Sequence, residues 1–152
     1  MAELTYRAAV GRAIAQEMRR DESVVFLGED VAAAGGVFKT TSGLLEEFGP
    51  DRVIDTPISE QAILGTVMGA AMTGLRPIAE IMYSDFLAVC WDLVANQIAK
   101  TRYMTDGQVS LPLVVRTGNG GGLRFGAQHS QSLANWAMAV PGLKVVVPST
   151  PV

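Results

Sequence analysis

The chain has 152 residues, a formal net charge of −3 and a sequence pI of about 5.1. This length fits one domain with a substantial core, and the acidic balance argues against nucleic acid or an anionic membrane as a partner. Apolar residues make up 49% of the chain and charged residues 18%, which indicates that some apolar surface lies in subunit contacts. The single cysteine, Cys90, rules out an internal disulfide and suits a reducing compartment. No stretch reads as a secretory signal or as a membrane span, so we expect a cytoplasmic protein.

The hydrophobic pattern predicts helices that alternate with short strands. Thr5 is the expected N-cap of a first helix that runs to about Arg20. The further expected elements, in chain order, are a strand at 24–27, a short helix at 42–48, a strand at 52–55, a helix from 60 to about 73, a strand at 77–81 that begins with Pro77, a long helix capped by Ser84 and running to about Tyr103, a strand at 113–116, a helix at about 132–139 and a strand at 143–147.

This alternation indicates a doubly wound α/β fold, with a mainly parallel sheet and helices on both faces. The sequence given stops soon after the last expected strand, where such a fold would continue with another helix and strand. We therefore expect residues 1–152 to form a single domain that lacks its last elements.

The stretch at 52–80 contains a strand-to-helix turn that carries one acidic side chain. Proline at position 57 ends the preceding strand, and Ser59 is the expected N-cap of the next helix. Glu60 then falls in the first helical turn, in an otherwise apolar neighbourhood. We expect this glutamate to be the centre of a site.

The helix that follows Glu60 has a face of small residues. Its internal glycines each cost about 1 kcal/mol relative to alanine, so they need a compensating gain. Close approach by a partner helix or by a ligand would provide it. The small residues at steps of three and four are Ala62, Gly65, Thr66, Gly69, Ala70 and Thr73.

Ligands of open parallel sheets bind beyond the carboxyl ends of the strands. Four segments with acidic, aromatic or histidine side chains follow expected strands, so they would lie together at that edge. Their shared position predicts a site there. Taken singly, each has a plain structural reading: Glu60 can complement the helix dipole, Phe86 can be core, and His129 can be an ordinary loop or core residue. The four segments are Glu29-Asp30, Ser59-Glu60, the corner at 83–86 and the loop that leads to His129.

Several common site motifs are missing from the sequence. The glycine-rich loop at 117–126 matches neither the P-loop pattern nor Gly-x-Gly-x-x-Gly. No cysteine and histidine set has zinc spacing, and no Gly-x-Ser-x-Gly elbow is present. A P-loop nucleotide site, a zinc site and a serine hydrolase are therefore all disfavoured.

Five segments resemble the β subunits of thiamine-diphosphate-dependent 2-oxoacid dehydrogenases, a family that includes pyruvate, branched-chain and acetoin enzymes. They are DTPISE at 55–60, GAAMTGLRPIAE at 69–80, AKTRYMTDG at 99–107, AQHSQS at 127–132 and PGLKVVVPS at 141–149. The resemblance implies the domain that binds the aminopyrimidine ring of thiamine diphosphate. It also implies an enzyme that decarboxylates a 2-oxoacid oxidatively and passes the acyl group to lipoyl groups.

The resemblance also implies roles for individual residues. Glu60 would be the glutamate that hydrogen-bonds a pyrimidine ring nitrogen, and Phe86 the aromatic side chain against that ring. Ile58 and Met82 would be further ring contacts. His129 would be the active-site histidine that handles protons or positions the substrate.

The rest of the family's cofactor site would come from elsewhere. The family holds magnesium and the diphosphate through a Gly-Asp-Gly motif, which Asp106-Gly107 fails to match because Thr105 precedes it. An α subunit would therefore supply that half of the site in an α2β2 assembly with a β–β contact, and a lipoyl acyltransferase core would be a further partner. Leu113 matches a residue whose backbone carbonyl helps hold a potassium ion, with the other ligands beyond Val152. The isolated chain would be inactive.

Three other interpretations remain open. One is a transketolase or deoxyxylulose-phosphate-synthase type of pyrimidine domain, although AQHSQS at 127–132 and the start at Met1 favour the dehydrogenase β subunit. Another is a non-catalytic ligand-binding module in which Glu60 is only a helix-end charge. The last is an inactive scaffold derived from an enzyme.

Overall fold

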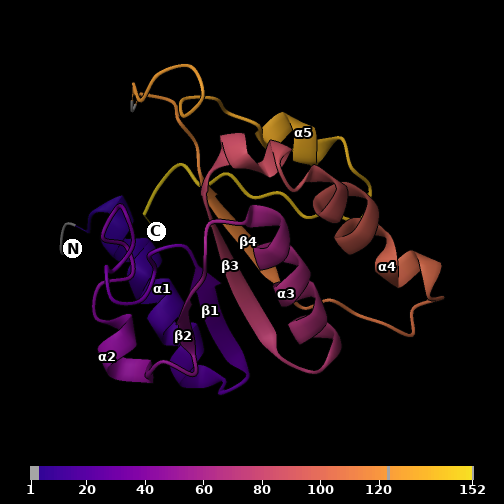
Figure 1. Ribbon diagram of the computed structural model, residues 1–152, viewed down its shortest axis with the longest axis horizontal. Coiled ribbons are helices and arrows are strands. Elements are labelled where there is room, and N and C mark those ends of the chain that lie inside the picture. The colour runs from indigo at the N-terminus through magenta and orange to yellow at the C-terminus, as the bar shows by residue number, and fades with distance from the viewer. Residues whose placement is uncertain (1–3, 123, 152) are drawn as a thin grey trace.

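The computed structural model describes residues 4–122 and 124–151, and within them it has a four-stranded, all-parallel sheet in the order β2-β1-β3-β4 (Figure 1). The strands are β1 (Val24–Gly28), β2 (Val53–Asp55), β3 (Arg76–Tyr83) and β4 (Val114–Gly118). The helices are α1 (Tyr6–Arg20), α2 (Leu44–Phe48), α3 (Glu60–Met72), α4 (Ala99–Met104) and α5 (Ala134–Met138), with a 3₁₀-helix η1 (Ser84–Ala88) and a π-helix η2 (Leu93–Ile98).

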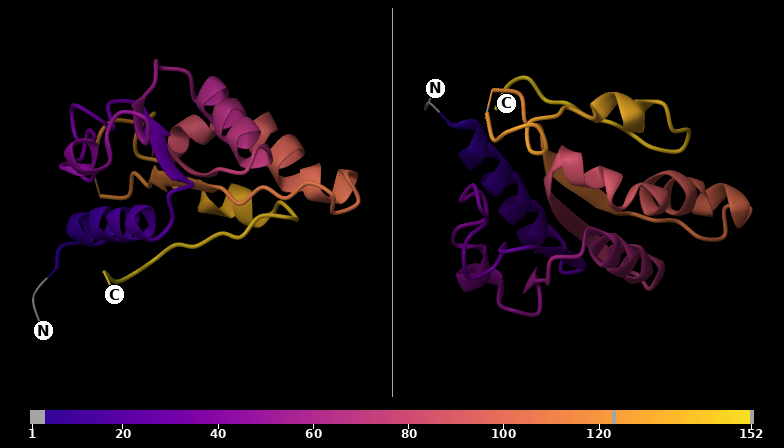
Figure 2. Two further views of the ribbon diagram at one scale, coloured as in Figure 1. Left: turned by 90° about the horizontal axis from the view of Figure 1, so that it is seen from below. Right: turned by 45° about the horizontal axis from the view of Figure 1, so that its top comes forward.

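Helices cover both faces of the sheet, which confirms the predicted doubly wound α/β fold. Figure 2 shows α1 on the opposite side of the sheet from α3. One core joins β1 and β3 to α3, η1 and η2 through Val25, Leu27, Ile63, Leu64, Val67, Ala79, Ile81, Leu87, Cys90 and Val94. The other joins β1 and β2 to α1, α2 and the loop after β1 through Ile14, Ala15, Met18, Val24, Phe26, Val31, Ala32, Leu44 and Val53.

The strand order determines where a ligand could bind. From β1 the chain passes to β2 on one side and then crosses to β3 on the other, so the connections diverge at the carboxyl ends of β1 and β3. Open parallel sheets bind their ligands at such a switch point. We therefore expect a ligand to bind at the carboxyl ends of these two strands.

The first helix forms as predicted, and an arginine fixes its far end. Thr5 is its N-cap, and the Thr5 hydroxyl oxygen accepts a hydrogen bond of 3.2 Å from Ala8 N. At the other end, Nη2 of Arg52 donates to the carbonyl oxygens of Met18 (2.7 Å), Asp21 (3.0 Å) and Val24 (2.8 Å). One side chain next to β2 thus ties together the end of α1 and the start of β1.

The long helix predicted at 84–103 is wrong as a single helix. The segment is instead a 3₁₀-helix, a turn, a π-helix and the short α4. Ser84 does not cap it; Tyr83 holds the N-cap position, and the Ser84 hydroxyl donates to the carbonyl of Gln131 at 3.0 Å. The Cys90 thiol donates to the carbonyl of Phe86 at 3.4 Å, a side-chain bond that competes with a regular helical ladder.

The expected start of α3 is confirmed in position, whereas the expected start of β3 is wrong. Ser59 occupies the N-cap position of α3, but its side chain makes no capping hydrogen bond with the residues described. Pro77 is the second residue of β3, because the strand begins at Arg76.

The predicted fifth strand at 143–147 is not formed in the part of the chain that the structure describes. An apolar run becomes a strand only when a neighbouring backbone edge pairs with it. This segment joins no ladder of the sheet, and Val146 is 79% exposed. Two hydrogen bonds hold it near its ends instead. Leu143 N donates to the carbonyl of Val140 at 3.4 Å, and the Tyr6 hydroxyl donates to the carbonyl of Pro148.

Across residues 4–122 and 124–151, no helix combines the length and the apolar character needed to cross a membrane.

Candidate active site

The turn after β2 is held firmly against the end of β1. The Asp55 carboxylate accepts hydrogen bonds from Ala32 N at 2.7 Å and Ala33 N at 3.4 Å, in the loop after β1. Thr56 N donates to the carbonyl of Gly28 at 2.9 Å. These bonds fix the position from which the chain enters α3, and so the position of its first residue.

Glu60 is that first residue, and its side chain is half-buried. Burial, and then the charge of Glu60, raises the pKa of Glu29 at the end of β1. Burial and the same charge raise the pKa of the Cys90 thiol to about 11. Because Cys90 bonds the carbonyl of Phe86, the Glu60 carboxyl lies near the segment that carries this aromatic residue.

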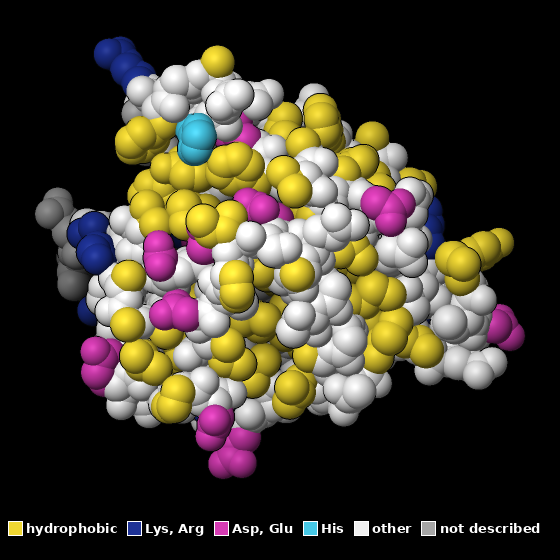
Figure 3. Space-filling view, viewed as in Figure 1, with side chains coloured by type: hydrophobic (Ala, Val, Ile, Leu, Met, Phe, Trp, Pro, Cys, Tyr) yellow, Lys and Arg dark blue, Asp and Glu magenta, His cyan; other side chains and the backbone are white. Residues whose placement is uncertain are grey.

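Tyr83, the last residue of β3, is the centre of an aromatic cluster that includes His129. The cluster contains two of the predicted site residues, because the rings of His129 and Phe86 also meet, with centroids 5.1 Å apart. These separations and the steep ring angles are typical of edge-to-face contacts. The centroid of Tyr83 lies 5.5 Å from Phe38, 6.1 Å from Phe86, 6.1 Å from Phe125 and 5.1 Å from His129. Figure 3 shows the single histidine at the surface beside a band of hydrophobic side chains.

The loop that carries His129 is anchored to the start of η1. Oδ1 of Asp85 accepts hydrogen bonds from the backbone N (3.2 Å) and the side-chain Nε2 (2.9 Å) of Gln131. The carbonyl of Gln131 in turn accepts from the Ser84 hydroxyl and from Gly120 N, both at 3.0 Å. Sequence reasoning named the corner at 83–86, but it missed the central place of Tyr83 among the rings and the contact between Asp85 and Gln131. An acid two residues after a buried strand was the available signal.

A β-bulge reshapes β3 at the predicted ring contact Met82. Ile81 pairs with Thr117 and Tyr83 with Gly118, so Met82 has no partner position on β4. Bulges often lie next to sites because they redirect side chains. Met82 is half-buried there, one residue before the centre of the aromatic cluster.

Ile58 and Leu113 lie apart from this cluster. Ile58, in the turn before α3, is 77% exposed, so this chain alone does not enclose it. Leu113 is half-buried just before β4, and its N–H bonds the carbonyl of Leu111 at 2.9 Å. The described residues contain no group of three or more histidine, cysteine or acidic side chains placed to hold a metal ion.

A partly buried ion pair joins β3 and β4. Arg116 of β4 donates to both carboxylate oxygens of Glu80 on β3, and these residues are direct register partners. Burial raises the pKa of the Glu80 carboxyl, against the opposite effect of Arg116. Gly28 lies on the other side, where a Cβ atom would come within 2.7 Å of Glu80 Cβ.

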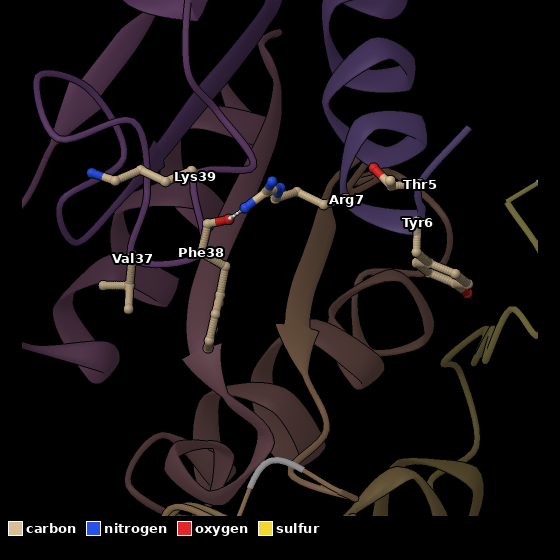
Figure 4. Close-up of a pocket in the computed structure, with 6 residues that line it drawn as sticks. All are labelled: Thr5, Tyr6, Arg7, Val37, Phe38 and Lys39. Carbon is tan, nitrogen blue, oxygen red and sulfur yellow. Dashed lines mark hydrogen bonds between the residues drawn. The ribbon is translucent and has the colours of Figure 1, made fainter. Parts of the chain in front are cut away.

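A hollow beside the aromatic cluster contains none of the predicted site residues. It is lined by Thr5, Tyr6, Arg7, Val37, Phe38 and Lys39 (Figure 4). Its two cations are turned to carbonyl groups: Arg7 donates to Phe38 O at 3.3 Å and Lys39 to Ala34 O at 2.7 Å. The predicted site is therefore the strand edge and not this hollow.

Residues 2–152 match the family model described as "Transketolase, pyrimidine binding domain". The chain belongs to this family.

Relatives of this pyrimidine-binding domain also confirm the resemblance inferred from the five segments. The chain is 51% identical to the acetoin:2,6-dichlorophenolindophenol oxidoreductase subunit beta of Bacillus subtilis, covering 94% of this chain and 45% of that protein. It is 50% identical to the pyruvate dehydrogenase E1 component subunit beta of Rhizobium meliloti, covering 99% and 33%. It is 47% identical to the 2-oxoisovalerate dehydrogenase subunit beta of Bacillus subtilis, covering 99% and 46%. The chain thus spans between a third and a half of the length of these relatives.

The fold of the domain also matches a solved structure. A split-gene transketolase, described as an inactive beta4 tetramer, superposes with a TM-score of 0.66 at 22% identity, over 91% of this chain and 41% of that chain. At this identity the match supports the fold alone.

Proposed function

We propose that this chain is the pyrimidine-binding part of the β subunit of a thiamine-diphosphate-dependent 2-oxoacid or acetoin dehydrogenase. The observation that carries the proposal is the position of Glu60, which begins α3 at the same edge as the Phe86–His129 ring pair. The near 50% identity to three β subunits supports the same assignment. The reaction would be the oxidative decarboxylation of a 2-oxoacid, or the matching cleavage of acetoin, with acyl transfer to lipoyl groups.

The residues present fit an aminopyrimidine ring. Such a ring is flat and carries nitrogen atoms at its edge, so it needs one carboxyl group at that edge and apolar groups against its faces. The charge of Glu60 acts on Cys90, one turn beyond Phe86, so the carboxyl and the aromatic ring lie on neighbouring segments. Ile58 and Met82 would complete the contacts of the ring. Thiamine diphosphate, when bound, supplies a nucleophilic carbon on its thiazolium ring.

Each residue of this chain would have a limited task. Glu60 would hold a proton at its carboxyl oxygen and share it with a ring nitrogen of the pyrimidine. Phe86 would orient the ring. His129 would hold or move a proton of the substrate, or position it, as histidine side chains do near neutral pH. Tyr83, which is only 6% exposed, keeps water from the inner side of the His129 ring.

A partner subunit would supply the remaining half of the site. The described residues offer no metal-binding cluster, so magnesium and the diphosphate would be held by an α subunit. The small-residue face of α3 suits such a contact, because a Cβ built on Gly65 or Gly69 would meet no described atom within 4 Å apart from its neighbours in the same helix. The proposal includes an α2β2 assembly with a β–β contact and a lipoyl acyltransferase core as a further partner. It also includes a potassium ion on the Leu113 carbonyl and a cytoplasmic location.

The deciding test is Glu60→Gln in the β subunit assembled with its α subunit. The amide cannot share a proton with the pyrimidine nitrogen, so kcat should fall by at least about 100-fold, the lower range for a group that acts in acid–base catalysis. Pyruvate, 2-oxoisovalerate and acetoin would each be assayed, and Glu22→Gln, a remote exposed change, serves as control. Near-normal turnover of the Glu60 variant would support a ligand-binding module or a scaffold instead.

A second test addresses the half-site. We expect this chain alone to bind thiamine diphosphate and magnesium no more tightly than the millimolar range. One aromatic contact contributes about 0.5–1.5 kcal/mol and one charged hydrogen bond about 1.5–3 kcal/mol, near the 4 kcal/mol of a millimolar complex. Calorimetric titration of the isolated chain measures this directly. Micromolar affinity would mean that the diphosphate site lies on this chain.

A further inference from the structure

Asp85 is a buried acid at the candidate site that the proposed chemistry does not use. It is only 6% exposed, and one of its oxygens, Oδ2, is buried without a hydrogen-bond partner among the described residues. Burying a carboxylate is costly unless its oxygens are bonded. The other oxygen, Oδ1, accepts two hydrogen bonds, both from Gln131. The Asp85 carboxylate is costly to bury and bonds only Gln131, so its role should be sought in what it does to Gln131.

Gln131 is bonded at its amide nitrogen, its carbonyl and its side chain, which fixes its backbone in place. Asp85 accepts from the nitrogen and the side chain, while Ser84 and Gly120 donate to the carbonyl. His129 is only two residues away, a distance of at most about 7 Å along the chain. Fixing Gln131 therefore restricts where the imidazole of His129 can lie.

The stretch just before His129 is rich in glycine. It contains Gly121, Gly122 and Gly126, and glycine gives a loop large conformational freedom. Apart from the ring contacts, the described anchors lie after the histidine, at Ser130 and Gln131: the Ser130 hydroxyl accepts from Phe125 N at 3.0 Å, and Gln131 meets Asp85.

We infer that Asp85 is a positioning residue, whose carboxylate holds Gln131 and thereby keeps the His129 ring edge-on against Tyr83 and Phe86. The importance of this for catalysis rests on the proposed role of His129. The positioning itself is a property of this chain and is tested without cofactor, partner or turnover.

The test uses the fact that His129 is the only histidine of the chain. Its ring protons give a single set of NMR signals, and the currents of the Tyr83 and Phe86 rings displace those signals from the values of a free histidine. Gln131→Glu replaces the 2.9 Å donor contact with two opposed carboxylates, at a side chain that is exposed and not part of the core. The matched control is Gln128→Glu, which adds the same charge to the same loop, on an exposed side chain.

In Gln131→Glu we expect the His129 signals to move most of the way to free-histidine values and to lose their cross-peaks to Tyr83 and Phe86. Core methyl signals, such as those of Val25 and Leu64, should stay in place, and Gln128→Glu should match the wild type. In Asp85→Asn/Gln131→Glu the asparagine amide can donate to the new carboxylate, so the His129 signals should return. Unchanged signals in Gln131→Glu, or a double variant as disturbed as the single one, would overturn the inference. Normal turnover in Glu60→Gln would overturn the proposed function and leave this result intact.

Discussion

The two halves of the candidate site are built differently. At the ends of β3 and β4, the rings of Tyr83, Phe86 and His129 contact one another, and Asp85 anchors the adjoining loop. At the end of β2, by contrast, Ile58 is exposed in the turn that precedes the half-buried Glu60. This chain thus completes the histidine half with its own side chains and leaves the Glu60 half open.

Glycines show the same difference between the halves. A Cβ atom on Gly120, in the histidine half, would come within 2.1 Å of Ser130 Cα. A Cβ atom on Gly65, in α3, would meet no described atom within 4 Å apart from its neighbours in the same helix. Gly120 is thus packed against its own chain, whereas Gly65 leaves space that a partner subunit could fill.

The largest expected effect contrasts Tyr83→Ala with Ile58→Ala. Removing the central ring of the cluster should cost about 3–5 kcal/mol of unfolding free energy, as large aromatic truncations in cores do. Truncating exposed Ile58 should change it by no more than about 0.5 kcal/mol. Urea denaturation followed by circular dichroism measures both. Equal losses would show that the halves are packed alike.

Replacing each of the two glycines, Gly120 and Gly65, with alanine should change the free energy of unfolding by a smaller amount and in opposite directions. Gly120→Ala forces the loop away from Ser130 and should destabilise the chain by about 1–3 kcal/mol, the usual cost of overpacking. Gly65→Ala should stabilise α3 by about 1 kcal/mol, because alanine favours a helix interior and nothing obstructs it. Thermal unfolding of the two variants in parallel provides the check. A destabilising Gly65→Ala in the isolated chain would mean that this face is already packed.

The first half of the fold could be predicted well from the sequence, since local patterns determine it. Capping by Thr5 and the proline at 57 define elements through neighbours a few residues away. Glu60 and His129 could be placed at one edge because parallel strands end together. Asp85 and Gln131 could not be paired, because 46 residues separate them and no local pattern encodes the contact. The run at 143–147 has strand-like residues, but pairing depends on a neighbouring edge that sequence does not reveal.

The smallest expected effect tests the link between Glu60 and the segment that carries Phe86. The pKa of the Cys90 thiol is raised to about 11, first by burial and then by Glu60. Cys90 is buried and its thiolate is scarce at pH 8, so labelling by a disulfide reagent should be slow and should rise with pH. Glu60→Gln removes the second of the two causes that raise the pKa, so it should lower the pKa of the thiol and speed the labelling.

The control for this experiment is Glu22→Gln, which lies on the loop before β1 and should leave the labelling rate unchanged. If Glu60→Gln also leaves the rate unchanged, then the Glu60 carboxyl points away from the Phe86 segment, and the two halves of the site are separate.

The hydrogen bonds of Arg52 have a consequence for how the molecule opens. Because one guanidinium holds the carbonyls of Met18, Asp21 and Val24, the last turn of α1 cannot fray while β2 stays in the sheet. Elements joined in this way unfold together as one cooperative unit. Amide protons in the last turn of α1 should therefore exchange with solvent at the pace of those in β2, although more than thirty residues of chain lie between them.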